Sequence, residues 1–224
     1  MKKIFFVFFC FSSLFSNPYD GRTIVVLDPA GHAGDLGRWL VAGYERAQTL
    51  KFAEAVRAGL LSKANLYTVI SRKAGEKVLP LQIPSFSNRL GADIFLRIHM
   101  YREESEKPQL HLYHLQFDPF IDLAPRSFDT LSLTPIYQAH FENIHKTRFY
   151  GNKMCEHLSQ DSFSRYFNCH DLIGLPLKNL VGVKAKVSIL LEVGICREDK
   201  WKSLVKPIVD SLLLVINGER SHNV

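Results

Sequence analysis

Short apolar runs that end in a polar residue recur along the chain and predict the strands of a central sheet. The runs at 24–27 and 93–100 and the run within 181–194 are almost continuous in Val, Ile, Leu and Phe, with no alternation. This pattern is typical of strands that are buried on both faces. Residues 66–71 predict another strand. Residues 110–115 alternate between apolar and polar positions, which predicts an edge or antiparallel strand.

Segments with helical periodicity separate these strands. In 44–62 the apolar stripe runs through Phe52, Ala53, Val56 and Leu60, a spacing that predicts an amphipathic helix. Further helices are expected at 85–90, 149–160 and 201–216. Such strand–helix alternation favours the α/β class. We therefore expect a three-layer sandwich with a mostly parallel central sheet and helices on both faces.

One carboxylate of the first helix breaks its apolar pattern. Glu45 lies seven positions before Phe52 and therefore on the inward stripe, whereas Glu54 should face solvent. A carboxylate that points inward is costly unless a cation or donor meets it. The alternative is a first-turn Glu that the helix dipole favours.

Three ionisable residues follow directly on buried strands. His32 lies in the glycine-rich turn after Asp28, His99 ends the 93–100 strand, and Glu192 ends the last strand. If these strands are adjacent and parallel, their ends lie about 5 Å apart, at the edge where α/β sheets bind ligands. Two imidazoles and one carboxylate are a known catalytic zinc set. For each residue the alternative is a structural role, such as an incidental loop His or a salt-bridged Glu.

The remaining histidines carry no ligand pattern. His111 and His114 alternate on a strand, so their side chains diverge to opposite faces. We interpret four further histidines as surface or packing residues: His140, His145, His157 and His170.

The first 18 residues differ from the rest. A basic start, a short apolar run and small residues predict a signal peptide at 1–18, with an uncleaved anchor as the alternative. We therefore expect an exported protein of the periplasm or cell envelope, with a single domain at 22–217.

Residues 118–148 lack periodicity, and we expect an insertion or lid there.

The net charge of the chain narrows the classes of molecule that it could bind. The net charge is +6, and loss of the leader would leave 26 basic against 22 acidic residues, which suits anionic envelope polymers. The sequence has no dense basic stripe of the kind that indicates nucleic-acid binding.

Outside the leader Cys155, Cys169 and Cys196 remain. A disulfide between the first two and free thiols are both open.

These motifs together resemble the zinc-dependent N-acetylmuramoyl-L-alanine amidases, cell-wall hydrolases with a D-P-G-H-G-G motif. The matching segments run from 23 to about 216 and keep the family's order: VVLDPAGHAGD, YERAQTLKFAEAV, VISRKAGE, SNRLGADIFLRIH and SILLEVG. Several motifs in one order are more specific than any one alone.

The resemblance implies a function and a role for each site residue. Zinc would be held by His32, Glu45 and His99, and Glu192 would be the catalytic acid/base. The reaction would be hydrolysis of the amide between the muramic acid lactyl group and L-alanine in peptidoglycan. We further expect Asp28 to orient His32. Protein activation and oligomeric state are left open.

The chain departs from the family pattern at three places. Ala30 lengthens the first motif by one residue, Arg97 replaces a small residue before Ile-His, and Glu76 lies near the place of a missing Asp. Arg97 could recharge the cleft by pairing with Glu45 or Glu192. Two alternatives therefore stay open: another zinc amidohydrolase or peptidase of similar fold, and a catalytically inactive wall-binding protein.

Overall fold

The computed structural model describes residues 21–63, 65–79, 81–116, 127–128, 131–132 and 136–222. The expected signal peptide lies outside these residues, as do 118–126, 129–130 and 133–135 of the expected insertion at 118–148. Among the described helices, none combines the length and the apolar character needed to cross a bilayer.

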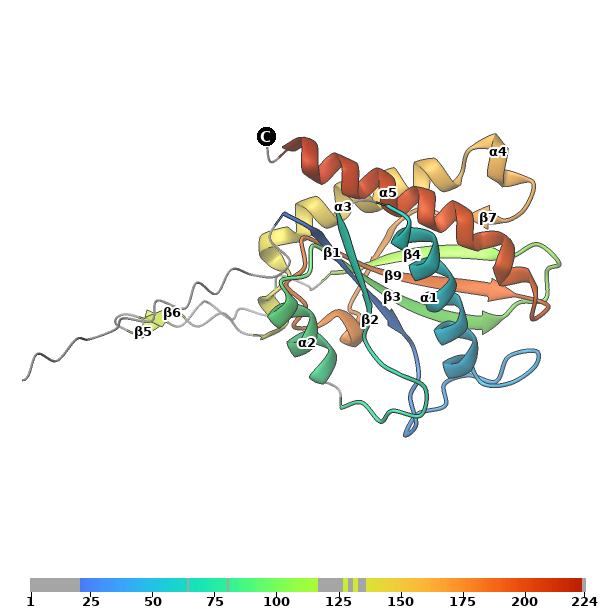
Figure 1. The fold of residues 1–224 in the computed structure, drawn as a ribbon, viewed down its shortest axis with the longest axis horizontal. Coiled ribbons are helices and arrows are strands. Elements are labelled where there is room, and N and C mark those ends of the chain that lie inside the picture. Colours follow the sequence, from blue (N-terminus) through green and yellow to red (C-terminus); the bar gives the residue numbers. More distant parts are fainter. Residues whose placement is uncertain are drawn as a thin grey trace, which may run out of the picture.

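A seven-stranded sheet forms the centre of the molecule (Figure 1). Its order is β2-β1-β3-β9-β4-β7, and β8 also pairs with β4. All neighbours are parallel except β4, which runs antiparallel to β9. The expected mostly parallel sheet is therefore confirmed, and the alternating segment is antiparallel as its pattern allowed. The strands are β1 (Thr23–Pro29), β2 (Leu66–Ile70), β3 (Ile94–Arg102), β4 (Gln109–Leu115), β7 (Asn168–Cys169), β8 (Ile173–Leu175) and β9 (Val187–Ile195).

Helices cover the two faces of the sheet unequally. The long helices α1 (Glu45–Leu61), α3 (Ile144–Leu158) and α5 (Val205–His222) pack on one face around the larger core. The second face carries α2 (Gln82–Leu90) and the short turn η3 (Lys178–Leu180) over a smaller core. The remaining short elements are β5 (Ser127–Phe128), β6 (Leu131–Ser132), η1 (Ile136–Gln138), η2 (Phe141–Asn143), α4 (Asp161–Ser164) and η4 (Lys200–Leu204).

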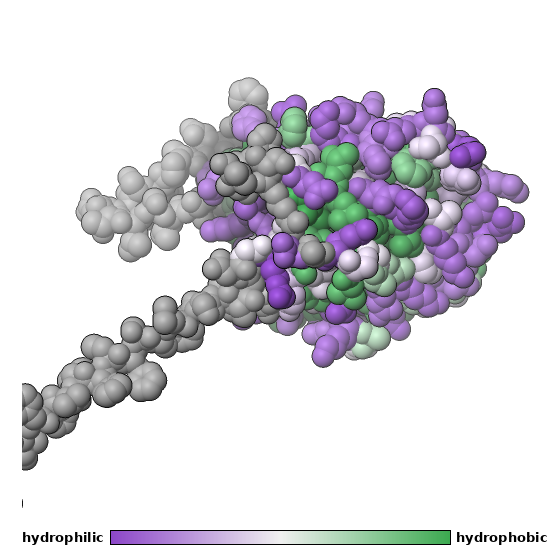
Figure 2. All heavy atoms as spheres, turned by 45° about the horizontal axis from the view of Figure 1, so that its top comes forward, coloured by the Kyte–Doolittle hydropathy of each residue, from purple (hydrophilic) through white to green (hydrophobic). Residues whose placement is uncertain are grey.

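The second face of the sheet changes character along the strands. Near the strand starts, Val26, Phe95 and Leu190 are buried in the smaller core. Two positions further on, Asp28, Arg97 and Glu192 point to the same face because side chains alternate along a strand. The half-covered second face thus presents polar groups at the carboxyl ends of the strands, whereas β1, β3 and β9 stay apolar on the first face. Elsewhere hydrophilic residues cover most of the surface, with hydrophobic ones gathered near the middle of one view (Figure 2).

We predict that two neighbouring leucines of α1 differ sharply in their contribution to stability. Leu60 is 0% exposed in the larger core, and Leu61 is 60% exposed. Leu60→Ala should lower the free energy of unfolding by about 2–5 kcal/mol because it leaves a cavity. Leu61→Ala, the matched control, should change it by less than about 0.5 kcal/mol. Urea denaturation measures both, and equal costs would contradict this placement of α1.

Candidate active site at the carboxyl ends of β1, β3 and β9

The sheet order brings the predicted site residues to one edge. β1 lies beside β3, β3 lies beside β9, and all three are parallel, so their carboxyl ends coincide. His99 is the direct register partner of Glu192. The adjacency on which the sequence interpretation depended is therefore present.

Glu45 is buried at the start of α1 and is fully engaged. Its side chain is 3% exposed. Oε1 accepts hydrogen bonds from the His99 ring and the Met100 N–H, both at 2.9 Å, and Oε2 accepts one from the Arg38 N–H at 3.1 Å. Burial alone would raise the pKa of Glu45, but these bonds more than offset it and hold the pKa below its ordinary value. The inward orientation expected from the helical stripe is confirmed.

Hydrogen bonds at both ring nitrogens determine the orientation and tautomer of His99. Nε2 lies 3.2 Å from the Arg97 Nε and 3.2 Å from the Asn179 side-chain nitrogen. Because both groups donate, Nε2 is the acceptor and the proton of a neutral ring lies on Nδ1. Nδ1 then donates to Glu45, so the imidazole joins α1 to η3.

Asp28 pairs with Arg97 rather than with His32. Its side chain is 1% exposed and forms an ion pair with the Arg97 guanidinium, while Ser71 Oγ donates to Oδ1 at 2.5 Å. In the described part of the chain it makes no hydrogen bond to His32, so its expected orienting role is not seen. Arg97 also does not contact Glu45 or Glu192, the partners expected for it; it joins Asp28 to His99.

His32 lies on the loop after β1, apart from Glu45 and His99. The additional residue Ala30 extends the ladder of β1, since its N–H donates to the Ile98 carbonyl at 2.8 Å. The chain then turns at Gly31, whose φ is +74°. His32 Nδ1 accepts a hydrogen bond from the Gly34 N–H at 3.0 Å. Among the described residues, no three His, Cys, Asp or Glu side chains are gathered so as to hold a metal ion.

Arg72 anchors this loop, a role that the sequence did not reveal. Its buried guanidinium donates to the carbonyls of Pro29, Ala30 and Arg46 at 2.7–3.0 Å. Burial lowers its pKa. The residue was visible only as the Arg of the VISRKAGE motif, and nothing in that motif indicates which carbonyls it reaches.

Glu192 is held by a cation from the same loop. Arg38 Nη1 lies 2.6 Å from Oε1, and the Tyr113 hydroxyl donates to Oε2 at 3.4 Å. Burial lowers the pKa of Arg38, but the hydrogen bond and charge of Glu192 outweigh burial, so its pKa is raised. Arg38 was not expected as a site residue. Its side chain is 51% exposed and is thus free to swing away from the carboxylate.

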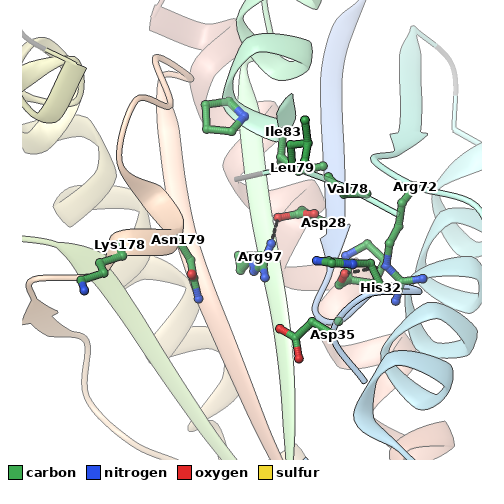
Figure 3. A pocket seen from close by; sticks show the side chains of 13 residues that line it. Asp28, His32, Asp35, Arg72, Val78, Leu79, Ile83, Arg97, Lys178 and Asn179 are labelled. Carbon is green, nitrogen blue, oxygen red and sulfur yellow. Dashed lines mark hydrogen bonds and ion pairs between the residues drawn. The ribbon is translucent and has the colours of Figure 1, made fainter. Parts of the chain in front are cut away.

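A cavity of about 250 Å³ opens beside Arg97 and Asn179, which both bond His99 (Figure 3). The Asp28–Arg97 ion pair lies in its middle, with His32 and Arg72 on one side and Lys178 and Asn179 on the other. Its apolar wall consists of Val78, Leu79, Ile83 and Pro84. The cavity thus combines cationic groups with an aliphatic surface. It lies next to the hydrogen-bonded pair of the His99 imidazole and the Glu45 carboxylate, two groups that can exchange a proton.

We predict that Glu45→Gln destabilises the protein at neutral pH and much less in acid. The amide would place an N–H₂ against the donors of Met100 or Arg38, at a cost of about 1–3 kcal/mol. Because the folded pKa of Glu45 is lowered below 4.5, its contribution is complete above about pH 4.5 and is lost as pH falls through the folded pKa.

Urea unfolding of wild type and variant between pH 7 and pH 3 measures this difference. Glu54→Gln, on the exposed side of the same helix, should change the unfolding free energy by less than about 0.5 kcal/mol at pH 7. The prediction would be contradicted if the difference in unfolding free energy between wild type and Glu45→Gln increased as the pH was lowered.

We also predict that Arg72→Ala loosens the loop that carries His32. The carbonyls of Pro29, Ala30 and Arg46 each lose one donor, and Ala30 keeps the bond from Thr49 Oγ1. Each group left unpaired costs about 1–3 kcal/mol. Amide hydrogen exchange at His32 and Asp35 should accelerate, with Arg57→Ala on the exposed side of α1 as control. Unchanged exchange in the Arg72 variant would show that the loop does not depend on this anchor.

Comparison with known proteins relates this architecture to amidase domains at the level of fold. No family model and no curated protein sequence matches the chain. The catalytic domain of CwlV, an N-acetylmuramoyl-L-alanine amidase from Bacillus (Paenibacillus) polymyxa var. colistinus, is 15% identical with a TM-score of 0.62, over 87% of this chain and 98% of that one. AmiC2 of Nostoc punctiforme is 18% identical with a TM-score of 0.59, over 88% and 98%.

A third amidase structure gives the same result. Ami1 from Mycobacterium smegmatis is 15% identical with a TM-score of 0.62, over 88% of this chain and 97% of that one. Coverage of nearly the whole neighbour means that the chain contains a complete domain of this type. The chain therefore has the α/β fold of the N-acetylmuramoyl-L-alanine amidase catalytic domains.

Proposed function

We propose that this protein is an N-acetylmuramoyl-L-alanine amidase, which hydrolyses the amide between the muramic acid lactyl group and L-alanine in peptidoglycan. One observation carries the proposal: Glu45, His99 and Glu192 meet at the carboxyl ends of β3 and β9, in a fold shared with amidase catalytic domains. The aliphatic and cationic cavity beside them suits a short acidic peptide.

The donor set fits a zinc ion in type, and two of its members fit in position. Glu45 Oε1 and His99 Nδ1 lie 2.9 Å apart, and two atoms bound to one zinc at about 2.0–2.1 Å each lie roughly 3 Å from one another. His32 is the remaining imidazole, on the adjacent loop, where its Nδ1 accepts from the Gly34 N–H. We propose these three residues as the zinc ligands, and zinc at His99 Nδ1 would displace the proton that this nitrogen donates to Glu45.

Zinc at this place would lower the pKa of a bound water molecule to near 7. The residues of the chain perform the remaining tasks. The Glu192 carboxylate accepts the proton from water and returns it to the leaving amine of L-alanine. Arg38 covers Oε1 and has to move for water to reach that oxygen. Arg97 and Asn179 hydrogen-bond Nε2 of His99 and fix the orientation of its ring.

The proposed substrate agrees with the expected location. We propose an exported enzyme of the cell envelope, and its basic composition favours contact with anionic wall polymers. One amidase of this fold, CwlD from Clostridioides difficile, has been solved in complex with the GerS lipoprotein. A protein partner of this chain would be analogous.

A second candidate function is a wall-binding protein without catalysis. The Arg38–Glu192 ion pair favours it, because the guanidinium covers Oε1 of the carboxylate that the amidase mechanism uses. In that case peptidoglycan would bind but no stem peptide would be released.

We predict that Glu192→Gln abolishes cleavage of a defined muropeptide, lowering kcat by at least about 10²–10⁴-fold because the general acid/base is lost. Product analysis should find a free lactyl carboxylate and an amino-terminal L-alanine from the wild type. Metal analysis should find about one zinc per chain in both proteins, and less in His99→Ala.

The matched control is Glu198→Gln, which removes a half-exposed carboxylate that binds Gln48 and Lys51. It should cleave as wild type does. Full activity of Glu192→Gln would refute the mechanism. Binding without any cleavage by the wild type would favour the wall-binding alternative.

A further inference from the structure

Four polar aromatic side chains lie together on the second face of the sheet, beyond Glu192. They are Tyr101 of β3, His111 and Tyr113 of β4, and His170 just after β7, and we call them the ring row. The His111 and His170 rings stack with centroids 4.1 Å apart and planes 2° apart. The Tyr113 ring is parallel to His111 within 8° at 6.2 Å. Tyr101 lies 6.2 Å from His111, tilted by 46°.

The ring row starts at the proposed catalytic carboxylate. His111 is the register partner of Glu192 on the neighbouring strand, and the Tyr113 hydroxyl is bonded to Glu192 Oε2 at 3.4 Å. In the strand order β1-β3-β9-β4, the cavity takes Asp28 from β1 and Arg97 from β3, whereas the ring row takes His111 and Tyr113 from β4 and Tyr101 from the last part of β3. Glu192 of β9 therefore lies between the Asp28–Arg97 cavity and the His111 and Tyr113 rings, and Tyr101 extends the ring row beyond His99 on β3.

Gly194 makes room for this arrangement. A Cβ added there would lie 2.5 Å from the Tyr101 ring, so any side chain at this position would displace Tyr101. The Tyr101 ring can approach the backbone of β9 only because Gly194 has no side chain. The position of Tyr101 in the ring row therefore depends on the absence of a side chain at Gly194, which shows that the row is specifically packed.

The ring row presents uncharged hydrogen-bonding groups. Burial, and then the charge of His170, lower the pKa of His111, so its imidazole is neutral at neutral pH. The Tyr101 hydroxyl donates to Glu103 at 3.1 Å and so accepts from His111 Nε2 at 3.2 Å. His170 Nε2 lies 3.0 Å from the Gln109 side-chain oxygen. Hydroxyl, imidazole and amide groups between aromatic rings match the alternating hydroxyls and apolar C–H surfaces of a sugar ring.

The opposite side of Glu192 has a different character. The cavity there carries Arg72, Arg97 and Lys178 together with an aliphatic wall, which suits carboxylates and small aliphatic side chains. The bond to be cleaved joins a sugar to a peptide, so one partner of that bond should lie on each side of the catalytic carboxylate.

We infer that the ring row is a subsite for an N-acetylated sugar of the glycan strand, and that the stem peptide extends the other way over the Asp28–Arg97 cavity. This inference rests on the proposed function and adds to it the direction in which the substrate lies. It assigns specificity roles to Tyr101, His111 and His170.

Two ligands that the enzyme cannot cleave test the subsite without any need for activity: the peptide-free N-acetylglucosaminyl-N-acetylmuramic acid disaccharide and the free stem tripeptide. Calorimetric titration of the full chain should show binding of both. His170→Ala should weaken disaccharide binding about tenfold, with tripeptide binding unchanged within about twofold. Tyr101→Phe, which keeps the ring over Gly194, should lower the affinity for the disaccharide by less than His170→Ala does and leave the affinity for the tripeptide unchanged.

His145→Ala, a substitution of an exposed histidine on α3 away from the row, is the matched control and should bind both ligands as wild type does. The inference is overturned if wild type does not bind the disaccharide, if His170→Ala binds it as tightly as wild type, or if the tripeptide is the ligand that is lost. Muropeptide cleavage, assayed separately, reports on the proposed function alone. Row-dependent disaccharide binding without cleavage would keep the sugar subsite and refute the amidase.

Discussion

The buried carboxylate of Glu45 is the contact on which the site depends. An ionised group that is 3% exposed would be costly without partners, and three donors from separate segments satisfy it: the His99 ring, the Met100 N–H and the Arg38 N–H. These bonds join the start of α1 to the end of β3 and to the loop after β1. Loss of any of these donors would leave the buried charge undercompensated, so the three segments are held in one arrangement.

The unequal cover of the sheet explains why the site lies where it does. Three long helices close the first face completely, and α2 with η3 closes only the strand starts of the second. Alternation along β1, β3 and β9 then exposes every second residue near the strand ends. Polar groups are tolerated there because water or neighbouring side chains can satisfy them, while the same strands remain apolar on their other face.

Arginines dominate the electrostatics of this edge. Arg97 joins Asp28 to His99, Arg38 covers Glu192, and Arg72 holds the loop carbonyls. Each guanidinium has several donors in one plane and can serve two acceptors at once. The Asp28 and Glu192 carboxylates are thereby each paired with a guanidinium, whereas Glu45 is satisfied by the His99 ring and two backbone N–H groups.

The sequence by itself determined the α/β class, five of the seven strands of the central sheet, the inward direction of Glu45 and the place of His99 and Glu192 at strand ends. These follow from apolar periodicity and from strand ends, which are local properties of the chain. The short strands β7 and β8 were not predicted, and the meeting of His99 with Glu192 depended on a strand adjacency that the tertiary structure decided. Only the tertiary structure decided the partners of Arg38, Arg72 and Arg97, the position of His32 after the ladder is extended by Ala30, and the assembly of the ring row. Long side chains reach across segments distant in sequence, and their choice among several acceptors depends on distances that no pattern along the chain encodes.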